Sequence, residues 1–225
     1  MARRPALALA LALVAALVVS GCAVGDPKPT TAVTDRGALL KADIYSSAVG
    51  DTEYFWRYGT TAAYGSETPH RTVAISDDDP HPVSEPLFSL SPSTEYHFQV
   101  CVKDGEESPP RTNCSTDRTF STTAAGPAVT VTAPVAGTSL PSSAPVLSLG
   151  TCGVASGDSP TIAVELWRGA EKVSTLTVQC TLLAWSASFT AQPAGDYTLV
   201  AKQINTVSGL TGQSAGTNFT LVPPA

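Results

Sequence analysis

Apolar and polar residues alternate in short runs along most of the chain beyond residue 37. In residues 38–44, for example, Leu40, Ala42 and Ile44 fall on one side of an extended strand, and Lys41 and Asp43 on the other. Glycine, proline, aspartate and serine separate such runs, and no segment beyond the N-terminal region keeps the helical period of about 3.6 residues. The pattern predicts an all-β chain of two tandem antiparallel β-sandwiches.

The first sandwich is expected over residues 33–123. Alternation around Trp56 places Trp56 and Tyr58 on one face of a strand, and Phe55 and Arg57 on the opposite face. We expect strands at residues 38–44, 53–59, 83–90, 90–102 and 115–122.

The segments YFWRYGTTAAYG, LSPSTEYHFQV and RTFST in this region resemble those of a bacterial fibronectin type III domain. That family has a Leu-x-Pro-x-Thr-x-Tyr corner, which Leu90, Pro92, Thr94 and Tyr96 match. The resemblance implies that the Tyr96 hydroxyl bonds back to the preceding loop while its ring fills the core. The resemblance implies a fold but does not imply any activity.

A short linker at residues 122–127 precedes a second expected sandwich, which covers residues 127–223. Its expected strands are residues 128–132, 145–149, 161–167, 172–178, 185–190, 196–204 and 218–222. The segment Gly195-Asp196-Tyr197 is similar to the Gly-x-Tyr corner of bacterial immunoglobulin-like surface repeats. This resemblance implies a bacterial Ig-like domain with Tyr197 at its tyrosine corner.

The N-terminal residues 1–21 have the features of a secretory signal peptide. Arg3 and Arg4 precede an apolar run at residues 6–19, which is shorter than the roughly 20 residues of a membrane span. Val19-Ser20-Gly21-Cys22 resembles the lipobox of bacterial lipoproteins, in which the cysteine receives diacylglycerol and becomes the first residue. We therefore expect Cys22 to be lipidated, residues 22–32 to form a tether, and the protein to sit on the extracytoplasmic face of the cell membrane. A transmembrane anchor and an ordinary cleavage site with a chance cysteine remain alternatives.

Five cysteines are present, and lipidation would occupy Cys22. Export to an oxidising compartment favours disulfides among the other four. Of the three pairings that four cysteines allow, only Cys101–Cys114 with Cys152–Cys180 keeps each bridge inside one expected domain. Alternation places Cys101 and Cys114 on opposite faces, so that bridge requires a β-bulge in the 103–115 connection. The cysteines lack the paired spacing of a zinc site.

The net charge of −6 argues against nucleic acid as a partner, because phosphate recognition needs clustered Lys and Arg. The densest acidic stretch is Asp77–Asp79, with His70, His81 and Glu85 nearby. Oxygen-rich loops can bind calcium, but consecutive aspartates point in different directions. A solvated surface loop is the favoured interpretation, and whether the loop binds calcium stays open.

No catalytic residue, metal site or cofactor is expected. The three histidines, His70, His81 and His97, neighbour no nucleophile motif, and neither a Gly-x-Ser-x-Gly sequence nor a phosphate-binding glycine loop is present. Aromatic side chains at outward positions offer a candidate binding surface, against the alternative of scattered surface aromatics. The residues of this candidate surface are Phe55, Arg57, Tyr64, His97 and Trp167.

Together these features predict a non-catalytic, lipid-anchored protein with a binding, adhesion or scaffolding role at the bacterial envelope. Its partners would be the membrane, through the lipid on Cys22, and an unidentified envelope protein or glycan. The alternative is an accessory or spacer module that tethers an envelope enzyme or binds cell-wall carbohydrate.

Overall fold

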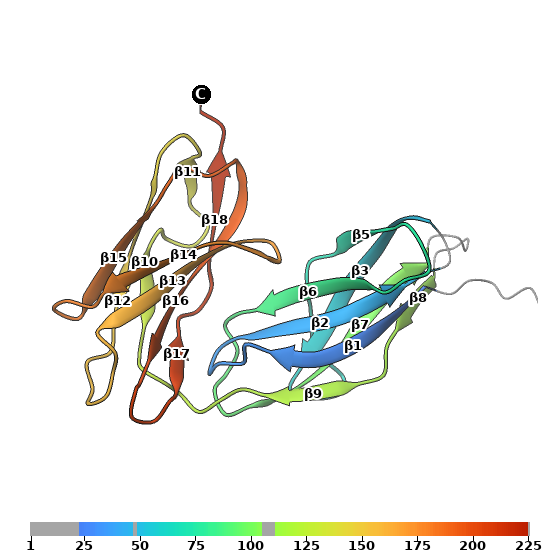
Figure 1. Ribbon diagram of the computed structural model, residues 1–225, viewed down its shortest axis with the longest axis horizontal. Helices are drawn as coiled ribbons and strands as arrows, with labels where there is room; N and C mark the ends of the chain where they lie inside the picture. The colour runs from blue at the N-terminus through green and yellow to red at the C-terminus, as the bar shows by residue number, and fades with distance from the viewer. Residues whose placement is uncertain (1–22, 47–48, 105–110, 225) are drawn as a thin grey trace, which may run out of the picture.

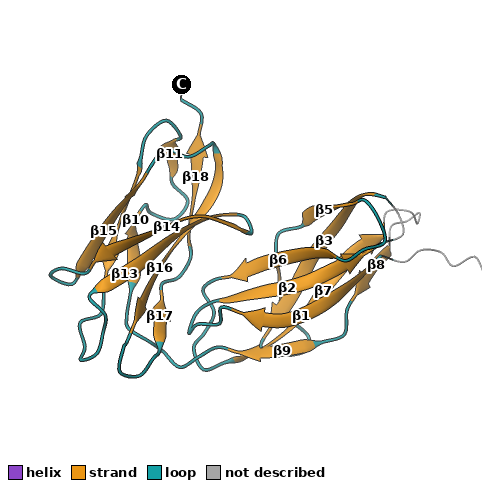
Figure 2. Ribbon diagram, viewed as in Figure 1, coloured by secondary structure: helices purple, strands orange, loops and turns teal. Residues whose placement is uncertain are grey.

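The computed structural model describes residues 23–46, 49–104 and 111–224. Every regular element in this part of the chain is a β-strand, and the strands gather into two groups that meet at an angle (Figures 1 and 2). The all-β class with antiparallel sheets is therefore confirmed. No helix in the described ranges has the length and apolar character that crossing a bilayer requires.

The first sandwich packs two sheets face to face. One sheet has the order β1-β2-β6, and the other the order β4-β3-β7-β8, with β5 paired to β3 and β9 paired to β7. The strands are β1 (Val24–Thr31), β2 (Ala38–Tyr45), β3 (Gly50–Gly59), β4 (Ser66–Glu67), β5 (Arg71–Ile75), β6 (His81–Leu87), β7 (Glu95–Asp104), β8 (Arg111–Cys114) and β9 (Arg118–Ser121).

The second sandwich has the same plan with a parallel pair at one edge. Its sheets have the orders β10-β12-β15 and β11-β18-β16-β13-β14, with β17 paired to β16 and β11 parallel to β18. The strands are β10 (Thr130–Ala133), β11 (Ser139–Pro141), β12 (Val146–Thr151), β13 (Thr161–Arg168), β14 (Glu171–Gln179), β15 (Ala184–Phe189), β16 (Gly195–Ile204), β17 (Thr211–Gln213) and β18 (Thr217–Val222).

The tether expected over residues 22–32 is wrong for its described part. Residues 24–31 form β1, an edge strand that pairs only with β2, and Ala23 is 3% exposed within the core. Pro27 and Pro29 suggested a linker, but proline is tolerated on an edge strand because it need not donate to a ladder. The first sandwich therefore begins one residue after Cys22.

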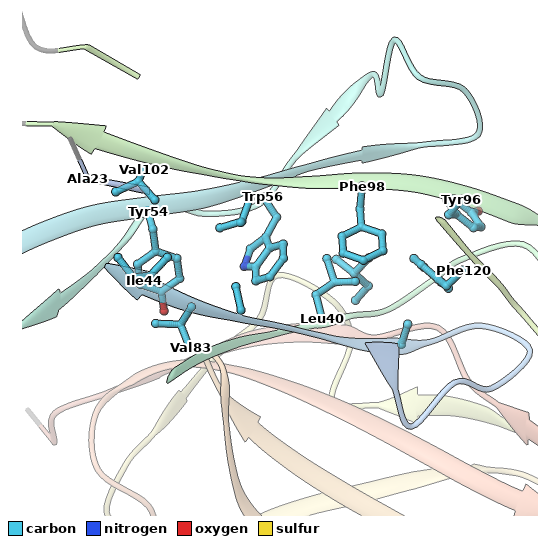
Figure 3. Packing of buried hydrophobic residues seen from close by; sticks show 14 of the residues in the cluster. Ala23, Leu40, Ile44, Tyr54, Trp56, Val83, Tyr96, Phe98, Val102 and Phe120 are labelled. Atoms are coloured by element: carbon cyan, nitrogen blue, oxygen red, sulfur yellow. The ribbon is translucent and has the colours of Figure 1, made fainter. Parts of the chain in front are cut away.

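Aromatic rings from the β3 and β7 sheet fill the core of the first sandwich (Figure 3). Trp56 is completely buried, with Phe98 at 6.1 Å between ring centroids and Leu40 reaching in from the facing sheet. A second cluster of buried residues, built around Trp185, Phe189 and Tyr197, forms a separate core in the second sandwich. Each sandwich therefore buries its own apolar face.

Both tyrosine corners have the geometry that the motifs imply. The backbone N–H of Ser91 donates to the Tyr96 hydroxyl at 3.0 Å, and the Tyr96 ring packs on Phe120 in the core. In the second sandwich the Tyr197 hydroxyl donates to the Pro193 carbonyl at 2.8 Å. Each hydroxyl thus ties a connecting loop to the strand that follows it.

The disulfide between Cys101 and Cys114 is confirmed, and so is the irregularity that it requires. Phe98 pairs with Arg118 and Cys101 pairs with Cys114, so three steps along β7 oppose four on the partner side. The extra residue lies between β8 and β9, where Ser115 bonds the Val100 backbone. This bulge turns Cys114 toward Cys101, which alternation alone would have kept on the opposite face.

The second disulfide joins Cys152 and Cys180, as expected. It links the loop after β12 to the loop after β14, and the Cys152 N–H also donates to the Leu183 carbonyl at 3.1 Å. The bridge therefore holds together two loops at one end of the second sandwich.

Leu182 and Leu183 form the two-residue turn between Thr181 and Ala184, whose backbones bond each other in both directions. Both leucines have left-handed backbones, with φ of 52° and 69°, and their side chains are 100% and 55% exposed. Such turns favour Asn-Gly, because a left-handed backbone costs an ordinary residue about 1–2 kcal/mol. The double change Leu182→Asn with Leu183→Gly is expected to raise the free energy of unfolding by about 1–2 kcal/mol in urea titrations.

A matched control is Val207→Asn, which also removes an exposed apolar side chain but has no positive φ. We expect no gain from that change. Equal gains from both variants would show that exposed apolar area, and not backbone strain, limits stability at this end of the sandwich.

Hydrogen bonds to a buried carboxylate join the two sandwiches. Asp35 is 3% exposed and accepts the N–H of Gln213 at 2.9 Å and the N–H of Gly126 at 3.3 Å. Thr34 donates its hydroxyl to Gln213 Oε1 at 3.1 Å, and Ser89 accepts the N–H of Gly216 at 3.1 Å. Burial raises the pKa of Asp35, although these N–H donors oppose the shift. The contacts cross from one sandwich to the other and fix their mutual orientation.

Candidate functional site

The candidate surface lies partly on the outer face of β3 and β7 in the first sandwich. Phe55 and Arg57 project from β3 on the side opposite Trp56, as alternation predicts. The exposure expected for Phe55 is wrong, because its side chain is only 2% exposed. His70 stacks on the Phe55 ring at 4.2 Å, and the Arg57 guanidinium lies 5.4 Å from its centroid. Phe55 is therefore a buried ring on which the side chains of His70 and Arg57 pack.

His70 is the centre of a charged cluster that the sequence did not indicate. Its ring bonds Glu53 through Nδ1 and Glu67 through Nε2, the latter at 2.8 Å. Lys103 contacts Glu53 at 2.5 Å, and Arg57 contacts Glu67 at 3.2 Å. Hydrogen bonds to Glu67 and then Glu53 raise the pKa of His70 above its ordinary value of 6.5. The cluster thus favours a positively charged imidazole on this face.

The His70 cluster predicts a pH dependence of stability. A raised folded-state pKa means that the stabilisation is complete below about pH 6.5 and is lost as the pH rises through the raised value. We expect the free energy of unfolding of the protein to fall over that window in a series of urea titrations, and His70→Gln to flatten the fall.

Glu67→Gln and Glu53→Gln provide matched tests, since each removes one cause of the shift. Each is expected to reduce the slope partly. An unchanged slope in all three variants would contradict the assignment to this cluster.

Tyr64 and His97 come together through Asp117. Asp117 accepts the Tyr64 hydroxyl at 3.1 Å and contacts His97 Nδ1 at 2.7 Å, while the Tyr64 hydroxyl also reaches Gln99 at 3.2 Å. The loop after β3 folds tightly over Gly59, where a Cβ would lie 1.5 Å from the Tyr64 carbonyl oxygen. Burial and the Asp117 carboxylate raise the pKa of Tyr64. The result is a fixed polar patch beside Arg57.

Trp167 does not belong to this surface, and the exposure expected for it is wrong. It lies on β13 of the second sandwich and is 8% exposed. Phe88 of the first sandwich packs edge-on against its ring at 5.7 Å. Trp167 Nε1 donates to Glu165 at 3.1 Å. The residue is buried because the first sandwich covers it, which the sequence of the second sandwich does not reveal.

In the acidic stretch Asp77–Asp79, Asp77 interacts with neighbouring residues of its own loop. Asp77 accepts the Asp79 N–H at 3.1 Å and lies 3.7 Å from His81. Glu85 points elsewhere and holds Arg71 through two contacts at 2.5 and 2.9 Å. In residues 23–46, 49–104 and 111–224, no three His, Cys, Asp or Glu side chains converge as metal ligands.

Sequence reasoning missed a buried carboxylate at the interface of the two sandwiches. Glu165 is contacted by Lys172 at 3.3 Å and by Lys202 at 3.0 Å. Burial alone would raise the pKa of Glu165, but the two ammonium groups outweigh it and hold that pKa below its ordinary value. The alternation of Glu165 with Val164 and Leu166 gives its face, but the lysines come from other strands.

No protein-family model matches the chain, and no curated protein matches it. Among solved structures, the sensor domain of the anti-sigma factor RsgI4 from Pseudobacteroides cellulosolvens is 18% identical, covering 45% of this chain and 95% of that one, with a TM-score of 0.35. Fibronectin(III)-like modules of Clostridium thermocellum CbhA are 9% identical over 89% of this chain and 94% of theirs, at 0.32. A two-domain fibronectin type III segment of chicken tenascin is 12% identical over 87% and 98%, at 0.25.

These TM-scores are all below 0.5, and the strand pairing of the chain itself defines its fold. The order β1-β2-β6 facing β4-β3-β7-β8, together with the Tyr96 corner, gives the first sandwich a fibronectin type III-like fold. Cys22 and the signal peptide lie outside the described residues, and their expected roles stay predictions.

Proposed function

We propose that this chain is a lipid-anchored, non-catalytic binding protein on the extracytoplasmic face of a bacterial membrane. Cys22 is its lipidation site, and the second sandwich is a bacterial Ig-like domain. An envelope protein or glycan is its partner.

The observation that carries this proposal is the pair of disulfides, one inside each sandwich. Cys101–Cys114 and Cys152–Cys180 both form, which is typical of a protein folded in an oxidising, exported compartment. Export agrees with the basic start, apolar run and lipobox-like sequence that precede Ala23.

The position of β1 determines which end of the first sandwich would lie at the membrane. Val24 pairs with Tyr45 and Ile44 pairs with His81, so the start of β1 lies at the end of the first sandwich that carries the β5–β6 loop. A lipid on Cys22 would hold this end at the bilayer surface, because Ala23 is already part of the core. The second sandwich then projects from the opposite end (Figure 1).

The buried contacts of Asp35 favour one further candidate, a spacer or accessory module with a fixed angle. Such a module would present an associated envelope enzyme at a defined distance from the membrane. Both candidates share the anchored two-sandwich unit and differ in the partner.

Cross-linking in intact cells, followed by recovery through a C-terminal tag and mass spectrometry, tests the proposal. We expect a dominant envelope protein or wall glycan with the wild-type chain, and its loss with Cys22→Ser. Recovery of neither would contradict a binding role. Recovery of an envelope enzyme would favour the second candidate, the accessory module.

A further inference from the structure

A cavity of about 310 Å³ lies between the two sandwiches, away from the β3 and β7 face. Its volume is at the lower end of the range for small-molecule sites, which commonly lie at domain interfaces. The first sandwich contributes apolar wall from β2 and β6, including Leu39 and Leu87. The second sandwich contributes Trp167, Ala170, Lys172 and Lys202.

The shape of the cavity is held by contacts that are independent of any ligand. Phe88 packs edge-on against Trp167, and the hydrogen bonds of Asp35 and Thr34 to Gln213 fix the adjacent interface. Binding to a preformed cavity requires little ordering of the protein, so little of the binding free energy is lost. These contacts therefore favour a binding site over a transient gap between mobile domains.

The charge at the cavity is positive, although the protein is acidic. Lys172 and Lys202 both contact Glu165, so two ammonium groups face a single carboxylate. The Lys172 ammonium also lies 5.6 Å from the centroid of the Trp167 ring. One positive charge remains uncompensated within this group, beside apolar walls.

Gln213 adds a polar side chain to the wall of the cavity. Gln213 lines the cavity and is almost fully buried, and its Oε1 accepts the Thr34 hydroxyl. Its Nε2 has no hydrogen-bond partner within the described residues. Nε2 lies against Gly37, so this amide helps to pack the interface at the edge of the cavity.

We propose that this cavity binds a small organic acid with an apolar body. The carboxylate would be held by Lys172 and Lys202, and the apolar body by Trp167 and the walls from β2 and β6. Both a fatty acid and an aromatic acid have this chemistry. The proposal goes beyond the envelope binding role and does not depend on lipidation of Cys22.

Three ligands that share a decyl chain but differ in the charge of the head group test the proposal. Decanoate, decanol and decyltrimethylammonium are titrated into the purified protein by calorimetry, with 1-naphthoate as the aromatic acid. We expect decanoate or 1-naphthoate to bind at one site at least tenfold more tightly than the neutral and cationic probes. The tighter acid identifies an aliphatic or aromatic ligand.

Two variants locate the site. Lys202→Met keeps the length of the side chain and is expected to remove the preference for the acid, and Ala170→Phe is expected to block all probes while leaving the charges in place. Lys41→Met, a lysine outside the cavity, is the matched control and is expected to have no effect. Since Lys202 also neutralises Glu165, thermal unfolding must show that its variant remains folded, and Ala170→Phe carries the test if it does not.

Equal affinity for the three decyl probes would overturn the proposal, as would acid binding that Ala170→Phe leaves unchanged. Absence of saturable binding by either acid would also overturn it. None of these results bears on cross-linking to an envelope partner, so the two proposals fail independently.

Discussion

Replacing Trp56 by alanine is expected to lower the free energy of unfolding of the first sandwich by about 3–5 kcal/mol. Trp56 is completely buried between the two sheets, and its removal leaves a cavity that the neighbouring rings Tyr54 and Phe98 cannot fill (Figure 3). Differential scanning calorimetry of the two-sandwich protein would detect the change as a strongly lowered first transition. A second transition should persist, because the second sandwich has its own core around Trp185.

Trp56→Phe is the matched control for this prediction. The indole Nε1 of Trp56 is buried and has no hydrogen-bond partner in the described residues, so phenylalanine removes an unpaired donor as well as volume. We expect it to cost less than half as much as alanine. A cost equal to that of alanine would mean that the indole makes a stabilising contact that the packing does not show.

Replacing Asp35 by alanine is expected to uncouple the two sandwiches. The change removes the acceptor of two backbone N–H groups, from Gln213 and Gly126, and leaves the first of them buried and unpaired. The loss is about 1–3 kcal/mol of interdomain stabilisation. Residual dipolar couplings measured by NMR on both sandwiches should change from one common alignment to two.

Asp35→Asn is expected to have a smaller effect, since its amide oxygen still accepts one N–H. Asp51→Ala removes an exposed carboxylate of the same sandwich and should leave the couplings unchanged. If Asp35→Ala retained one common alignment, the apolar contact of Phe88 with Trp167 would be sufficient to fix the orientation.

Residues whose environment is set by their own strand were predictable from the sequence. The alternation around Trp56 follows from the local pattern, the two tyrosine corners from the resemblance of their motifs to known families, and both disulfides from the limits of the two expected domains. The need for a bulge was also foreseen, although it lies between Cys114 and Arg118 and not within the 103–115 connection.

The wrong predictions concern residues whose burial or strand pairing depends on segments that are distant in the sequence. Trp167 is covered by Phe88 from the other sandwich, and Phe55 by His70 from a loop beyond β3. Residues 24–31 have a linker-like composition and become a strand because β2 offers an unpaired edge. The lysines at Glu165 come from β14 and β16, so the cluster becomes visible only in the folded chain.

The central claim is that a lipid on Cys22 anchors two disulfide-bonded sandwiches at the extracytoplasmic face. Mass spectrometry of the N-terminal peptide, from the membrane fraction of bacteria that express the full chain, tests it most directly. The account predicts a peptide that begins at Cys22 and carries a diacylglyceryl adduct, with the Cys22→Ser protein absent from that fraction. An unmodified peptide from a protein outside the membrane fraction would contradict it.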